Sequence, residues 1–107
     1  MKDIRIDVGV YTVLYINLTD EHFSNAKKVI FTVKNYPEVT TEAIIERAFD
    51  KAGKHEIIIT PEESIKLSDK AVYDFDKVRA DDKRVKLTDV GRIVLRKGAG
   101  DCIDDRG

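Results

Sequence analysis

The sequence predicts an all-β fold, a sandwich of two sheets built from about seven antiparallel strands. Apolar and polar residues alternate over short segments, which is the period of a half-buried strand. Turn-forming residues such as Gly9, Pro37 and Gly53 separate these segments. The segments recur about every eight to twelve residues, a spacing typical of sandwiches.

The first three predicted strands span residues 4–8, 10–18 and 28–34. In each of them an apolar residue recurs at every second position, so one face of the strand is expected to be buried. These residues are Ile4, Ile6 and Val8, then Leu14, Ile16 and Leu18, and then Val29, Phe31 and Val33.

The fourth segment, residues 42–49, carries two conflicting signals. Its apolar residues also form a helical stripe, with Thr41 as a possible N-cap and Gly53 as a possible stop. A helix over residues 41–52 would make the fold α+β. We favour a strand because the segments on both sides are strands, and tertiary context often overrides local propensity.

The last three predicted strands span residues 55–60, 71–78 and 91–97. The first of these is rich in β-branched residues, and the other two alternate. Between them, Thr60, Pro61 and Glu63 match a capping box with proline at the first helical position, which predicts one short helical turn.

Length and composition indicate one domain over residues 1–97, followed by a polar tail over residues 98–107. The 19 basic and 20 acidic residues leave a net charge of -1, which argues against a nucleic-acid partner. No apolar run is long enough to cross a membrane, and the N-terminus lacks an apolar leader, so synthesis in the bacterial cytoplasm is expected. Cys102 is the single cysteine and excludes an internal disulfide.

No motif for catalysis, a metal or a cofactor emerges from the sequence, so we expect a protein that is not an enzyme. His22 follows Asp20 and Glu21, but adjacent residues do not converge on one ion without further ligands. A second acidic group near residues 74–82 is interspersed with lysine and arginine, which indicates a neutralised surface loop.

Two sets of apolar residues stand at positions expected to face solvent, and both are candidate protein interfaces. The first, here called the Ile30 stripe, comprises Ile30, Val72 and Val94. The second, the tyrosine stripe, comprises Tyr11, Val13, Tyr15 and Ile58 and is expected on the other sheet. The Ile30 stripe could support a weak homo-oligomer.

The segment from Leu67 to Phe75 resembles the corner that leads into strand F of immunoglobulin domains. In that family a tyrosine near the start of the strand hydrogen-bonds to upstream backbone, and Tyr73 takes its place here. Phe75 stands where the family has a disulfide cysteine. The resemblance implies an immunoglobulin-like sandwich without a disulfide, and a hydroxyl bond from Tyr73 to residues 61–69.

The order of features also resembles prophage-encoded immunoglobulin-like domains, similar to the N-terminal domain of upper baseplate proteins in phages of Gram-positive hosts. The matching parts are Asp20-x-x-Phe23-Ser24-x-Ala26, residues 29–34, residues 57–60 and Ala71-x-Tyr73-Asp74-Phe75. This resemblance implies a structural role, other tail or baseplate proteins as partners, and incorporation into a virion. The alternative is a ligand-binding module, for example for a cell-wall glycan, with Tyr11 and Tyr15 as the residues on which sugars would stack.

Overall fold

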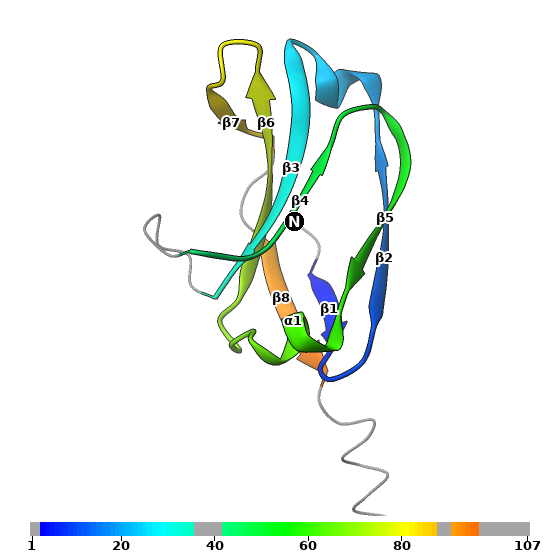
Figure 1. Ribbon diagram of the computed structural model, residues 1–107, viewed down its shortest axis with the longest axis vertical. Helices are drawn as coiled ribbons and strands as arrows, with labels where there is room; N and C mark the ends of the chain where they lie inside the picture. The colour runs from blue at the N-terminus through cyan, green and yellow to red at the C-terminus, as the bar shows by residue number, and fades with distance from the viewer. Residues whose placement is uncertain (1–2, 36–41, 88–90, 97–107) are drawn as a thin grey trace, which may run out of the picture.

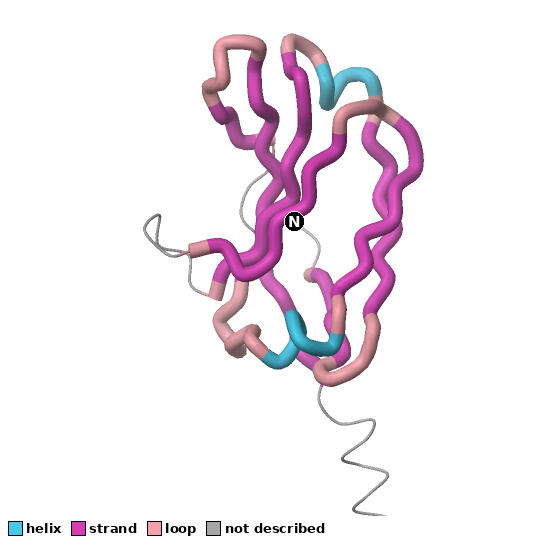
Figure 2. The backbone as a smooth tube through the Cα atoms, in the orientation of Figure 1, coloured by secondary structure: helices cyan, strands magenta, loops and turns pink. Residues whose placement is uncertain are grey.

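The computed structural model describes residues 3–35, 42–87 and 91–96, and these form an all-β sandwich (Figure 1). The predicted polar tail and Cys102 lie outside the described residues. The strands are β1 (Ile4–Asp7), β2 (Thr12–Leu18), β3 (Ala26–Lys34), β4 (Ala43–Phe49), β5 (Gly53–Ile59), β6 (Val72–Arg79), β7 (Arg84–Lys86) and β8 (Gly91–Arg96). Two short helices, η1 (Asp20–Phe23) and α1 (Pro61–Ile65), lie at opposite ends of the sandwich (Figure 2).

The larger sheet has the order β1-β8-β6-β3-β4, and β7 pairs with β6 beside this path. The second sheet contains β2 and β5, paired antiparallel. The structure confirms the predicted all-β sandwich and differs from the prediction in two details. The described part of the chain has the additional strand β7, and β1 runs parallel to β8, with Ile4 opposite Ile93.

The chain passes from β1, in the larger sheet, to β2, in the smaller sheet, through a turn at Gly9. Gly9 has a φ of 86°, in the left-handed region that favours glycine. The reversal at Gly9 brings the chain from the edge of one sheet into the other. The Asp7 N–H also donates to the Thr12 hydroxyl (3.1 Å), which closes the turn.

The fourth segment is strand β4, as predicted, and the helical alternative is wrong. It pairs antiparallel with β3, from Val29 opposite Phe49 to Val33 opposite Ile45. Ile45 is buried against the core, whereas the next residue, Glu46, is exposed. The backbone ladder to β3 and the burial of Ile45 outweigh the helical stripe seen in the sequence.

The core lies between the two sheets and is aliphatic with an aromatic centre. Phe31 is fully buried, and its ring lies 5.1 Å from that of Phe75 and 6.0 Å from that of Tyr73. Burying one such side chain contributes roughly 1.5–3 kcal/mol, so this cluster fixes how the sheets pack. The fully or nearly fully buried aliphatic side chains of the cluster include Ile6, Val33, Ile45, Ile57, Ile59 and Ile93.

The connection from β5 to β6 begins with the predicted capping box. The Glu63 N–H donates to the Thr60 hydroxyl (3.2 Å), and the Thr60 N–H donates to the Glu63 carboxylate (3.0 Å). Asn35 holds the end of the connection, because its side-chain oxygen accepts from the Ser68 N–H (2.8 Å). Tyr73 is buried, as its corner position predicts, and the bond from its hydroxyl to residues 61–69 stays a prediction.

Candidate functional site

The tyrosine stripe lies on the outer face of the β2–β5 sheet, as the sequence predicted. Val13 is directly opposite Ile58, and Tyr15 is opposite Glu56. Tyr11 and Tyr15 expose 67% and 76% of their surface, and Val13 and Ile58 expose 42% and 46%. The inward positions of the same strands, such as Ile57 and Ile59, are buried. The stripe is therefore a row of neighbouring apolar side chains in contact with solvent, bordered by Glu56.

The Ile30 stripe does not exist as predicted. Ile30 is only 6% exposed, so it cannot present a surface to a partner. Its opposite residue on β6 is Asp76, whereas Val72 is opposite Lys34. Ile30 and Val72 are thus four residues apart along the sheet, roughly 13 Å. Val94 is half-buried and pairs with Arg5 on β1.

A charged groove of about 450 Å³ occupies that face of the larger sheet instead. Arg84 forms an ion pair with Asp76 (3.1 Å), and Lys86 forms one with Asp74 (2.7 Å). The hydrogen bond from Lys86 to Asp74 raises the pKa of the Lys86 ammonium. The lysine and arginine neutralise Asp74 and Asp76, but these two residues lie in strand β6 and not in the surface loop that the sequence indicated. The groove is lined by Thr32, Lys34, Ala43, Glu46, Asp74, Asp76, Arg84 and Lys86.

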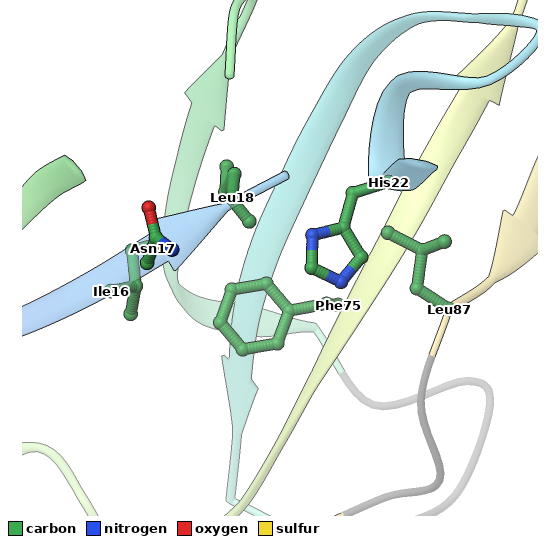
Figure 3. Close-up of a pocket in the computed structure, with 6 residues that line it drawn as sticks. All are labelled: Ile16, Asn17, Leu18, His22, Phe75 and Leu87. Carbon is green, nitrogen blue, oxygen red and sulfur yellow. The ribbon is translucent and has the colours of Figure 1, made fainter. Parts of the chain in front are cut away.

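An apolar pocket of about 280 Å³ opens between β2 and β6 (Figure 3). Phe75 forms its floor between the side chains of Ile16 and Leu87, and the His22 ring closes one end (Figure 3). His22 Nδ1 accepts from the Thr19 N–H (2.9 Å), so in the neutral ring Nε2 carries the proton. The pocket is lined by Ile16, Asn17, Leu18, His22, Phe75 and Leu87.

The arrangement of β1 explains why this side of the sandwich is open. β1 pairs with β8, not with β2, and it is only four residues long. Within the described strands, β5 is the ladder neighbour of β2. No strand of the described chain therefore covers the edge of β2 beside Ile16 and Leu18. No pattern in the sequence predicts this pocket, because the pocket depends on which sheet β1 joins.

Arg47 and Glu63 form a partly buried ion pair that sequence reasoning missed. Arg47 Nη2 donates to both carboxylate oxygens of Glu63, at 2.7 and 2.9 Å, and to the Ile58 carbonyl oxygen at 3.1 Å. Burial would raise the pKa of Glu63, but the bonds from Arg47 and from Thr60 N–H outweigh it, and the pKa is lowered. This pair joins β4 to α1 at the end of β5.

Among the residues that the structure describes, no group of three His, Cys, Asp or Glu side chains is placed to hold a metal ion. Nor does any helix in the described ranges have the length and apolar character needed to cross a membrane. The His55 ring packs against the Phe49 ring at 4.7 Å and contacts the Lys51 carbonyl oxygen, so its role in this fold is structural.

Comparison with protein-family models finds no match, and neither does comparison with curated proteins.

Proposed function

We propose that this protein is a non-enzymatic assembly module that binds other proteins through the tyrosine stripe. The observation that carries the proposal is the exposure of four neighbouring apolar side chains, two of them tyrosines, on one sheet face. Exposed apolar patches with a polar rim are typical of protein contact sites, and tyrosine is enriched in them.

Covering this face with a partner would remove apolar surface from water and so favour binding. Each square ångström of apolar surface removed from water contributes roughly 25 cal/mol, and tyrosine adds a hydroxyl that can bond to the partner. Glu56 and Lys54 stand on the same face and supply charges of both signs at the rim. A net charge of -1 produces little long-range repulsion against a partner.

We further propose that the partners are tail or baseplate proteins of a phage, and that the chain is incorporated into a virion. The support is the resemblance of residues 20–34 and 57–75 to prophage immunoglobulin-like domains, together with the sandwich fold on which that resemblance depends. A structural role in a particle also agrees with a surface on which four exposed apolar side chains lie together on one sheet face.

The test is co-purification of the chain with the tail and baseplate proteins that are encoded beside its gene. Val13→Lys places a charge within the tyrosine stripe and should abolish binding. Val85→Lys is the matched control, because Val85 is a strand valine of similar exposure, 38% against 42%, outside the stripe. Retained binding in Val13→Lys would exclude the stripe as the interface, and a gene neighbourhood without tail proteins would refute the phage assignment.

The second candidate is glycan binding, favoured by the exposure of Tyr11 and Tyr15 on the same face. Aromatic faces of this kind can stack on sugar rings. A pull-down with purified cell walls distinguishes the two functions. If the protein binds glycans, wild type should bind the walls and Tyr15→Ala should lose that binding. If it does not, wild-type protein should not bind the walls.

A further inference from the structure

The free edge of β2 has the features of a strand that accepts another strand. In an antiparallel ladder every second residue directs both its N–H and its C=O to the same neighbour. Within the described strands β2 pairs with β5 alone, so alternate residues of Thr12–Leu18 direct these groups away from β5. Unpaired backbone groups along an edge are a template for pairing with another chain.

β2 also lacks the residues that usually protect such an edge. Natural edge strands carry charges, proline or bulges that prevent pairing with another chain. Thr12–Leu18 contains no charged residue, proline or glycine, in a chain that is 36% charged. The other described edges are protected: Arg5 and Asp7 lie in β1, Glu46 and Arg47 in β4, and Lys54 and Glu56 in β5.

We infer that a second copy of this chain pairs its β2 antiparallel with this edge, around a twofold axis at Tyr15. The axis falls there because Tyr15 is the centre of a seven-residue strand, so this register pairs the whole strand. The two β2–β5 sheets then join into one sheet of four strands. Tyr15 lies opposite Tyr15 of the second copy, and Val13 lies opposite Asn17.

Composition and the apolar pocket both favour a second copy as the occupant. Because β2 carries no charge, no like charges meet across the new pair. In this register Leu14 lies opposite Ile16 on the inward face. Ile16 lines the apolar pocket, so Leu14 of each copy is placed at the mouth of the other copy's pocket. Pockets for alternate side chains are what give strand addition its specificity.

The dimer is expected to be weak. One pair of seven-residue strands is small compared with stable interfaces, which bury roughly 1,200–2,000 Å². Disulfide trapping suits a contact of this strength, because it records an encounter that dissociates quickly. The inference does not rest on the proposed function, since the tyrosine stripe could bind other proteins whether or not the edges pair.

The experiment uses the full chain with Cys102→Ser and one new cysteine in each variant. Tyr15→Cys should form a disulfide dimer under mild oxidation, because directly opposite residues have Cα atoms about 4.5–5.5 Å apart and a disulfide needs roughly 4.4–6.8 Å. Ile58→Cys is the control on the same face. In the joined sheet its two copies are three strand spacings apart, roughly 14 Å across the strands, and are also offset along them, so they cannot bridge.

The register has its own test. Val13→Cys and Asn17→Cys should each stay monomeric alone, because like positions lie about four residues out of register, roughly 13 Å. A mixture of the two should form a mixed disulfide. Circular dichroism of each variant confirms that it is folded.

Three results would overturn the inference. Equal trapping of Tyr15→Cys and Ile58→Cys would mean that the sheets meet face to face. Trapping of Val13→Cys alone, equal to that of the mixture, would mean that contact is random. A folded Tyr15→Cys variant that remains monomeric at millimolar concentration would exclude a second copy as the occupant of this edge. Loss of co-purification with tail proteins tests the proposed function and not this inference.

Discussion

Ser64 is expected to stabilise the end of the sandwich where α1 meets the turn before β2. Its side chain is fully buried, its hydroxyl donates to the Pro61 carbonyl oxygen (2.8 Å), and it accepts from the Gly9 N–H (2.8 Å). Ser64→Ala removes both bonds and leaves the Gly9 N–H without this partner. At about 1 kcal/mol for each of the two bonds, the free energy of unfolding should fall by about 2 kcal/mol.

Urea denaturation followed by circular dichroism measures this change. With a slope of about 1–3 kcal/mol per molar, the midpoint should fall by roughly 1 M while the slope stays constant. Ser24→Ala is the matched control, because Ser24 is exposed and bonds to Glu21 and Lys77 through its backbone N–H and C=O. If the two variants unfold at the same midpoint, the Ser64 bonds contribute nothing net, and the link from α1 to Gly9 is not a stabilising one.

Three further predictions concern the same end of the fold. Glu63→Gln should destabilise by about 1 kcal/mol near neutral pH. Burial would raise the pKa of the Glu63 carboxyl, but bonds from Arg47 and Thr60 lower it below its usual value of 4.5. The contribution of Glu63 to the free energy of unfolding is therefore complete above 4.5 and is lost as pH falls through the lower pKa of the folded state. The urea midpoints of variant and wild type should then converge at acid pH. Asn35→Ala removes the bonds to Ser68 N–H and Lys66 carbonyl oxygen and should cost about 1–2 kcal/mol in thermal unfolding, whereas an unchanged transition would show that the corner has another anchor. Tyr73→Phe should cost about 1 kcal/mol if the predicted hydroxyl bond forms, and an unchanged urea midpoint would contradict the corner.

Strand positions were predictable because alternation and turn residues are local properties. The capping box at Thr60 was equally local, and the structure contains it with both bonds. β4 required context, since its sequence suits a helix as well as a strand. The hydrogen-bond ladder to β3 decides it, and that ladder cannot be seen within a window of ten residues.

The error over Ile30 has a physical cause that the sequence partly shows. β3 lies inside the larger sheet, between β6 and β4, and five consecutive residues, from Val29 to Val33, are buried. The sequence of a strand that is covered on both faces is a continuous apolar run, such as Val29-Ile30-Phe31. The register could not be predicted, because irregularities at both ends of β3 shift its pairing with β6 and β4.

The candidate sites depend on a single long-range choice, the pairing of β1 with β8. That choice leaves β2 and β5 as a sheet of two strands, and an isolated pair of strands is only marginally stable in water. The pair must therefore be held by packing of Ile57 and Ile59 into the core, while its outer face carries the tyrosine stripe. Addition of a strand at β2 would extend this small sheet at its one uncharged edge. Strand addition should then slow local opening of β2, so that amide hydrogen exchange at Thr12–Leu18 becomes slower as protein concentration rises, while exchange in β4 stays constant.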